Sequence, residues 1–287
     1  MVYFYDKNHQ YIRDDGIEYT SVSRLVDPYK EKFDDVFCSI RRAFRNYDES
    51  LYTKAKEKYH YNDPLIINEL QGSVNDDLLK EILHNAFSLR IEWKEKGITS
   101  SDEGTEMHYY KERIDELNGY KINPLDGRKY KVIPRPRSDE YDNMDIMDEI
   151  LKMKEDVCVL EAMIVDHDSL IGGQEDVVFL KYMGAGHFIG TQMDYKTDEE
   201  INMKSFFSKG FKKMKYPLGY FMDCNFYHYA IKMSLYAVML EKKKIKIVKN
   251  VLEHVQDIEN SYYFYPMIYR SHAKKLIEIH KSRSAQS

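Results

Sequence analysis

The pattern of apolar and polar positions changes its period part-way along the chain. After residue 156, apolar and β-branched residues fill three successive segments, VCVLEAMIVD (157–166), EDVVFLKYM (175–183) and HFIGTQMDYKT (187–197). Short runs of this kind are typical of β-strands, and the Gly-containing turns between them favour antiparallel neighbours. The pattern therefore predicts a three-stranded meander over residues 157–197.

Helical periodicity dominates the chain before the meander. Apolar residues three and four positions apart predict an amphipathic helix over 76–96, and a helix interrupted near Pro28 is predicted over 23–45. A further helix is expected to start at Ser101 or Asp102 and to end at Gly119. Residues 2–22 instead predict a hairpin that turns at Asp-Asp-Gly.

The chain after the meander returns to a helical period over 225–243. A strand over 245–255, a short aromatic strand and a closing helix from Ser271 follow. This order of elements predicts an α/β fold with long helical additions. We assign residues 1–100 to an N-terminal hairpin and helical region and residues 101–287 to the core, which we expect to be one compact unit.

Composition indicates where such a protein works. The 287 residues suffice to bury a core, and the three cysteines are too few and too widely spaced for a disulfide framework. The opening MVYFYDKNHQ lacks the basic and apolar regions of a signal peptide, and no apolar run is long enough to span a membrane. We therefore expect a soluble, cytoplasmic protein without a membrane partner.

Charge is distributed unevenly along the chain. The formal net charge is −5, yet residues 138–156 alone carry eight acidic residues and two lysines. Three segments, 127–137, 203–215 and 242–249, each carry five Lys or Arg and no acid. Such runs form solvated faces or grooves that follow a nucleic-acid backbone.

The segment 203–215 has the composition of a nucleic-acid contact. Phenylalanines alternate with its lysines, which suits phosphate contacts beside rings that stack on bases. Lys209, Lys212 and Lys213 are therefore candidate DNA-binding residues.

Three residues of the predicted meander form a candidate catalytic group. Asp194 and Lys196 share one face of their strand because side chains alternate, and Asp176 meets them if its strand is the neighbour. Two carboxylates beside an ammonium suit a hard divalent cation and phosphodiester hydrolysis. An isolated D-x-K more often merely flanks a strand end, so further residues must support the interpretation.

Four pieces of sequence, in order, supply that support. EGTEMH (103–108), IGGQED (171–176), MDYKT (193–197) and KMSLY (232–236) resemble the G-T-x-x-H, G-x-x-D, D-Y-K-T and Q-x-x-x-Y motifs of the PD-(D/E)XK nuclease superfamily, in its branch of RecB-like and phage exonucleases. The resemblance implies a restriction-endonuclease-like core, a central mixed β-sheet flanked by helices, with a helical N-terminal extension.

The resemblance also implies a set of roles. His108, Asp176, Asp194 and the backbone carbonyl of Tyr195 would bind Mg²⁺ or Mn²⁺, and Lys196 would position or activate the attacking water. Neutral imidazole beside carboxylates suits either cation.

The fourth motif would contribute DNA contacts. Its residues here are Lys232 and Tyr236, so a lysine replaces the usual glutamine. The change loses an amide that can donate and accept, but it gains a cation that could reach a phosphate.

Two further acidic residues, Glu175 and Glu161, are also candidates for metal ligands. Glu175 replaces an apolar residue before the metal-binding aspartate, so a shift of one residue would make Glu175 the ligand and turn Asp176 into the core. Asp176 is favoured, because a buried unpaired charge is costly. Glu161 on the preceding strand is a further candidate, as an accessory ligand or as an ordinary strand residue.

These observations favour a metal-dependent DNA nuclease. We expect an exonuclease that acts on DNA ends or single strands, with the N-terminal helices available to form an arch over DNA. The alternatives are a structure-specific or nicking endonuclease of the same fold, a DNA-binding module with a decayed site, and a scaffold for protein partners.

Overall fold

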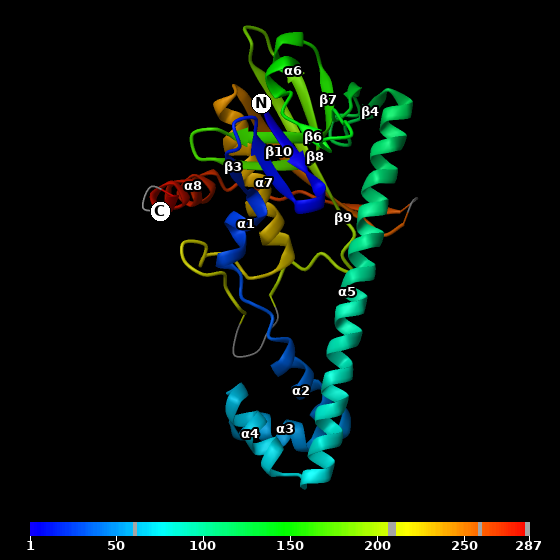
Figure 1. Ribbon diagram of the computed structural model, residues 1–287, viewed down its shortest axis with the longest axis vertical. Helices are drawn as coiled ribbons and strands as arrows, with labels where there is room; N and C mark the ends of the chain where they lie inside the picture. The colour runs from blue at the N-terminus through cyan, green and yellow to red at the C-terminus, as the bar shows by residue number, and fades with distance from the viewer. Residues whose placement is uncertain (60–61, 206–210, 258–259, 285–287) are drawn as a thin grey trace. The chain divides into compact units, whose positions relative to one another are not determined.

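The computed structural model describes residues 1–59, 62–205, 211–257 and 260–284 (Figure 1). The chain divides into two compact units. The first comprises Met1–Lys30, Gly104–Ser205 and Lys213–Ser287, and the second comprises Glu31–Glu103 and Phe206–Lys212. The first unit contains the sheet, and the second is helical.

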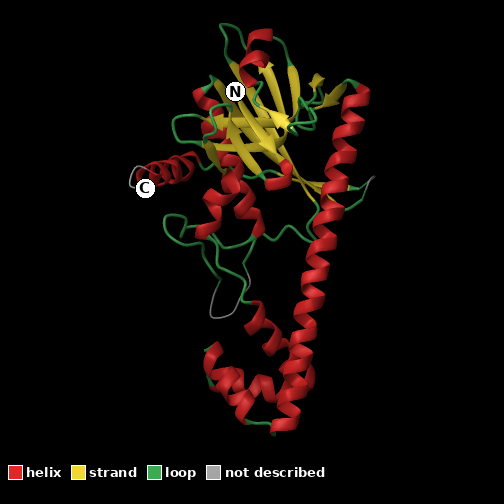
Figure 2. Cartoon of the chain, in the orientation of Figure 1, coloured by secondary structure: helices red, strands yellow, loops and turns green. Residues whose placement is uncertain are grey.

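A mixed β-sheet forms the first unit, as Figure 2 shows in yellow. Its main order is β11-β10-β9-β8-β3-β2-β1-β6, and β7, β5 and β4 branch from β8. The pairs β9–β10, β3–β8 and β5–β7 are parallel, and the others are antiparallel. The strands are β1 (Val2–Tyr5), β2 (Gln10–Arg13), β3 (Glu18–Ser21), β4 (Tyr120–Ile122), β5 (Lys129–Ile133), β6 (Asn143–Met144), β7 (Val157–Asp166), β8 (Ile171–Tyr182), β9 (Phe188–Lys196), β10 (Ile245–Val255) and β11 (Ser261–Phe264).

Helices flank this sheet and build the second unit. In the first unit they are α1 (Val22–Val26), α6 (Met147–Met153), α7 (Asn225–Lys242), α8 (Arg270–Ser284) and the short 3₁₀ turns η1 (Asp6–Asn8) and η2 (Asp27–Tyr29). The second unit contains α2 (Asp35–Tyr47), α3 (Glu49–Lys58), α4 (Asp63–Gly72) and the first part of α5 (Asp76–Asn118), whose last turns belong to the first unit. The predicted α/β class, mixed sheet and helical N-terminal region are confirmed.

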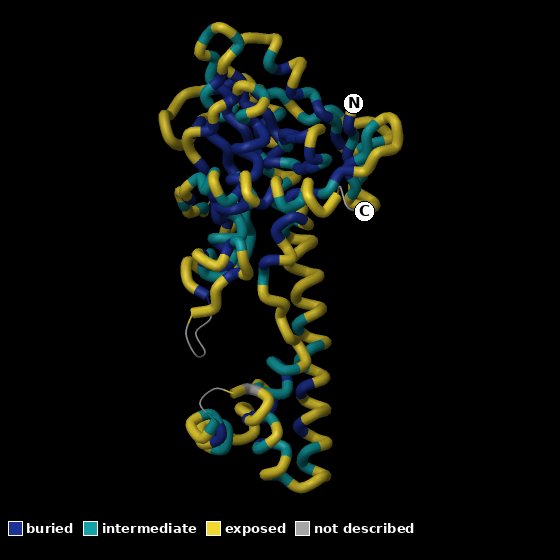
Figure 3. The backbone as a smooth tube through the Cα atoms, turned by 90° about the vertical axis from the view of Figure 1, so that its left-hand side faces the viewer, coloured by how far each residue is buried: buried dark blue, intermediate teal, exposed yellow. Residues whose placement is uncertain are grey.

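Both faces of the central strands are covered. Helix α7 buries eleven side chains, and Ile231 and Leu235 join Val178 and Ile247 in one core. On the opposite face, a second cluster that includes Phe179 packs against Met107 of α5. Figure 3 colours the core dark blue. Each fully buried Leu or Ile contributes about 1.5–3 kcal/mol, so this packing fixes the strands that carry the site.

Helix α5 differs from the prediction, because one helix replaces two. It begins after Asn75, whose side chain accepts a hydrogen bond from the Leu78 N–H, and it ends at Gly119 with φ of 70°. Ser101 and Asp102 lie inside it, so neither begins a helix. A cap residue starts a helix only where the chain leaves helical geometry, and glycines inside a helix cost only about 1 kcal/mol each.

The N-terminal segment also differs. The Asp-Asp-Gly turn joins β2 to β3, with Gly16 at φ of 87°, and β1 adds a third strand. Because β3 pairs with β8, residues 1–30 belong to the unit that contains the core and not to the helical region 31–103. A pairing between residues this distant in sequence leaves no local signal.

Across the described ranges, every helix is too short or too polar to cross a bilayer.

Candidate metal centre

The two aspartates of the predicted site lie where strands β8 and β9 separate. The antiparallel ladder between them ends at the pair Val177 and Met193, immediately before Asp176 and Asp194. Beyond that point β9 continues along β10, while β8 continues along β7. The Tyr195 N–H donates to Asp176 Oδ2 at 2.5 Å, so a side chain replaces the lost ladder partner.

Lys196 lies against Asp194, as the alternation of side chains predicted. Its Nζ is 2.6 Å from Asp194 Oδ2 and donates to the Tyr195 carbonyl at 2.8 Å. The Asp194 carboxylate and the Tyr195 carbonyl thus both contact the ammonium. The structure brings these predicted residues together with Asp176.

His108 reaches the same place from helix α5. Its Nδ1 lies 3.6 Å from Asp176 Oδ1. One turn earlier, Gly104 passes so close to the end of β9 that a Cβ there would lie 2.7 Å from Thr197 Oγ1. A larger residue would hold the helix away from the sheet, so the glycine allows His108 to approach the carboxylates.

Glu161 completes the group from β7. Ligand atoms of His108, Glu161 and Asp176 all lie within 4.8 Å of one another. The β7–β8 ladder skips Glu161 and Asp176, and Glu161 has φ of 46°, a left-handed conformation unusual for its type. The buried Asn143 fixes this irregularity, because its Nδ2 donates to the Glu161 carbonyl at 2.6 Å.

The histidine and its nearest carboxylate favour their charged forms. Burial opposes a charged imidazole, but the Asp176 carboxylate outweighs it and raises the pKa of His108 to about 9. Burial likewise opposes ionisation of Asp176, but His108, Lys196 and the Tyr195 N–H lower its pKa.

The other acids of the site are harder to ionise. Burial and the nearby Asp176 charge raise the pKa of Glu161 to about 8. Burial also raises the pKa of Asp194, against the opposing effect of Lys196. Burial works against the Lys196 ammonium, but the charges of Asp194 and Asp176 raise its pKa. An added cation would relieve the repulsion among the three acids.

Glu175, the alternative ligand, does not belong to the group of ligand atoms that converge with His108. Its side chain is only 1% exposed, and burial followed by the Asp194 and Asp176 charges raises its pKa well above the usual value. Its Oε1 has no hydrogen-bond partner within the described parts of the chain. Asp176, not Glu175, is the β8 acid that meets His108.

The donor set fits a divalent cation. One imidazole nitrogen and two carboxylates converge, and a cation bound there would displace the proton that Asp176 favours on His108. Among the residues described, none donates a hydrogen bond to the Glu161 carboxylate. Oxygen donors suit Mg²⁺, and an added nitrogen also suits Mn²⁺. The position of Glu161 therefore suits an accessory ligand, one of the two roles that the sequence left undecided.

Neither a family model nor a curated protein matches this chain. The interpretation of the site therefore depends on its own residues and contacts.

The four sequence motifs meet in pairs. Gly104 contacts Thr197, which joins the first motif to the third. A Cβ on Gly173 would lie 2.5 Å from the Tyr236 hydroxyl and 2.6 Å from its ring, which joins the second motif to the fourth. Tyr236 itself is 8% exposed, so it supports the strand of Asp176 and offers little surface to DNA.

Lys232 lies one helical turn before Tyr236 and is half-buried. Burial and the charges of Lys30 and Lys196 lower its pKa to about 8, against the opposing effects of Asp194 and Asp27. In the described chain, no carboxylate forms an ion pair with it. It is therefore a cation available to an anion beside the site, and Lys30 is a neighbour that the sequence did not indicate.

The other predicted DNA contacts are less defined. Lys209 lies outside the described residues. Lys212 is exposed in the second unit, and Lys213 is exposed in the first.

Helix α5 is held to the sheet by ion pairs that the sequence analysis missed. Lys111 pairs with Glu253, and Glu112, 3% exposed, lies 3.1 Å from Arg135 and also pairs with Arg137. Positions 108, 111 and 112 share one helix face, so their spacing in the sequence could have indicated that Lys111 and Glu112 face the sheet together with His108. These pairs position His108.

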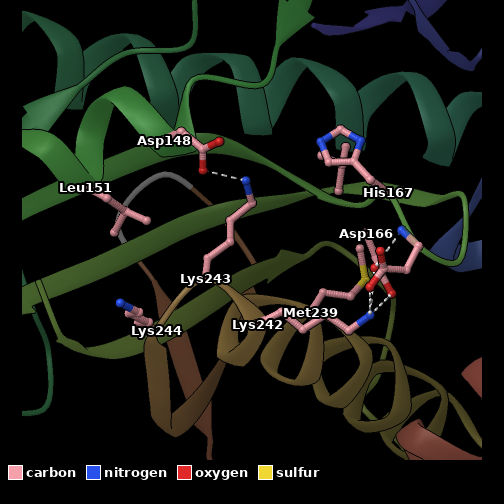
Figure 4. Close-up of a pocket in the computed structure, with 10 residues that line it drawn as sticks. Asp148, Leu151, Asp166, His167, Met239, Lys242, Lys243 and Lys244 are labelled. Carbon is pink, nitrogen blue, oxygen red and sulfur yellow. Dashed lines mark hydrogen bonds and ion pairs between the residues drawn. The ribbon is translucent and has the colours of Figure 1, made fainter.

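A separate concavity of about 380 Å³ lies at the C-terminal end of α7 (Figure 4). Lys242 donates to both oxygens of the buried Asp166 at 2.7 Å, and Lys243 donates to Asp148 at 2.7 Å. These lysines are neutralised within the protein, and we assign the pocket no catalytic role.

Proposed function

We propose that this protein is a metal-dependent nuclease that hydrolyses phosphodiester bonds in DNA, acting from ends or on single strands. The observation that carries the proposal is the convergence of His108, Glu161 and Asp176 beside the pair Asp194 and Lys196. The second group adds a fixed ammonium to the candidate ligand set. Carboxylates and an ammonium together are what phosphodiester hydrolysis requires.

The roles follow from the contacts. His108, Glu161 and Asp176 would hold Mg²⁺ or Mn²⁺, and Asp194 and the Tyr195 carbonyl are further oxygen donors beside them. The cation would act as a Lewis acid toward a phosphoryl oxygen and would acidify water. Lys196, oriented by Asp194, would donate a hydrogen bond to the water or to a phosphate oxygen as negative charge develops.

Digestion of end-labelled linear single-stranded, linear duplex and circular DNA with Mg²⁺ or Mn²⁺ tests the proposal. We expect cleavage of linear DNA that chelation of the metal abolishes. Asp176→Ala and Asp194→Ala should abolish cleavage, and Lys196→Ala should slow it about 10²–10³-fold.

The control is Asp139→Ala, which removes an exposed carboxylate remote in sequence from the site and should cleave like the wild type. Undiminished cleavage by Asp194→Ala or Asp176→Ala would overturn the assignment. Cleavage of circular DNA at the rate of linear DNA would instead favour an endonuclease of the same site.

A further inference from the structure

The loop that connects β9 to α7 is firmly anchored over residues 213–221. Met214, Leu218 and Phe221 are at most 3% exposed and belong to the main core. The Met214 N–H donates to the Phe221 carbonyl at 3.0 Å, and the Lys215 N–H donates to the Tyr29 carbonyl at 2.8 Å. The residues between these anchors are therefore presented on a fixed backbone.

Two tyrosines project from this anchored loop. Tyr216 is 82% exposed and Tyr220 is 80% exposed, the highest values among large apolar side chains in the described chain. The Tyr220 ring lies edge-on to Phe221 and roughly parallel to His272, with centroids 5.4 and 6.5 Å away. Rings this exposed on an anchored backbone can bind a flat partner with little loss of conformational entropy.

The start of the loop belongs to one of three basic segments, and the other two are partly neutralised by ion pairs. In segment 127–137, Lys131 pairs with Glu155 and both Arg135 and Arg137 pair with Glu112. In segment 242–249, Lys242 and Lys243 pair with acids of the pocket in Figure 4, whereas Lys244, Lys246 and Lys249 form no ion pair with the described residues.

Lys213 and Lys215, at the start of the anchored loop, are exposed, and within the described residues neither has a carboxylate at ion-pair distance. Their positive charge is therefore accessible to a polyanion.

Cations also connect the loop to the metal centre within the first unit. Lys215 is bonded through its backbone to Tyr29, the neighbour of Lys30. Lys30 and Lys196 both act electrostatically on Lys232. Lys30 pairs with Asp27 and Lys196 with Asp194, each at 2.6 Å, so Lys215 and Lys232 are the two of these four cations that have no ion pair with the described residues.

We propose that Tyr216 and Tyr220 form a stacking platform for single-stranded nucleic acid, with Lys213 and Lys215 contacting its phosphates. Bases of a single strand expose the faces that stack on tyrosine, whereas bases in a duplex are already stacked. This inference rests on the proposed function in one respect: a strand bound to the platform would be the substrate that the metal centre cleaves.

Fluorescence anisotropy with a labelled oligothymidylate, in EDTA to prevent cleavage, tests this platform. Tyr216→Ala and Tyr220→Ala should each weaken binding about 5- to 100-fold. Tyr216→Phe and Tyr220→Phe keep the ring and should bind like the wild type. Lys215→Ala should reduce the slope of log K against log salt by about 0.7.

Tyr262→Ala is the matched control, since Tyr262 is also exposed, at 57%, but lies on strand β11. It should leave binding unchanged. Wild-type affinity in both loop alanine variants, or an equal loss in Tyr262→Ala, would overturn the platform. Strand binding that depends on the tyrosines without metal-dependent cleavage would instead overturn the nuclease and leave the platform standing.

Discussion

At the residue scale, the backbone of Glu161 shows how the site is built. A left-handed conformation costs a residue with a side chain about 1–2 kcal/mol, and here the buried Asn143 holds it in place. The conformation interrupts the ladder opposite Asp176 and brings the Glu161 carboxylate toward His108. A local departure from strand geometry thus coincides with the convergence of three ligand groups.

Lys232 gives a pH test at this scale. Its pKa is lowered to about 8 by burial and by Lys30 and Lys196, against Asp194 and Asp27, so its charge is present below that pH and lost above it. If Lys232 binds a DNA phosphate, affinity measured in EDTA should fall as pH rises from about 7 to about 9.

The matched variant is Lys232→Arg, which stays charged and should lose less affinity than the wild type over the same interval, the remaining loss coming from His108 and Glu161, which also titrate there. Lys232→Ala should bind more weakly at neutral pH and show a smaller dependence on pH. A wild-type profile identical to that of Lys232→Ala would place this side chain away from DNA.

At the element scale, helix α5 tests how glycine positions the site. A Cβ on Gly97 would have no neighbour within 4 Å, whereas one on Gly104 would meet Thr197 Oγ1. Gly97→Ala should therefore raise the free energy of unfolding by about 0.5–1 kcal/mol, measured by urea denaturation.

Gly104→Ala should stabilise the protein less than Gly97→Ala and should reduce metal-dependent cleavage, because either the helix that carries His108 or the Thr197 side chain must shift. Adding Thr197→Ala removes the contacting hydroxyl and should restore much of the cleavage. If Gly104→Ala behaves like Gly97→Ala in both measurements, the close approach does not position His108.

The sequence predicted the elements whose signal is local. Strands β7, β8 and β9, helix α7 and strand β10 lie close to their predicted ranges, because each has its own period of apolar residues. The single helix α5 was missed, because Ser101 and Asp102 are good caps only where a helix begins.

The candidate site was predictable to a similar degree. Spacing along β9 placed Asp194 and Lys196 on one face, and motif order brought in His108 and Asp176. The role of Glu161 was not decided, because it depends on a backbone conformation that no residue type reveals. Nor did the sequence show that Tyr236 packs against Gly173.

At the scale of the whole molecule, the net charge of −5 conceals an ordered distribution. The acidic stretch 138–156 supplies partners for other segments: Asp148 pairs with Lys243, and Glu155 pairs with Lys131. Lys213 and Lys215 form no such pair with the described residues and are exposed. A protein with a negative net charge can therefore attract a polyanion locally, and this attraction should weaken with salt.

The central claim is that His108, Glu161 and Asp176 hold a divalent cation, and titration calorimetry with Mn²⁺ tests it without any assumption about the substrate. We expect the wild type to bind Mn²⁺, and Asp176→Asn and Glu161→Gln each to weaken binding at least about 10- to 100-fold. Asp139→Asn should leave binding unchanged. Absence of Mn²⁺ binding by the folded wild type, or wild-type affinity in Asp176→Asn, would contradict the account.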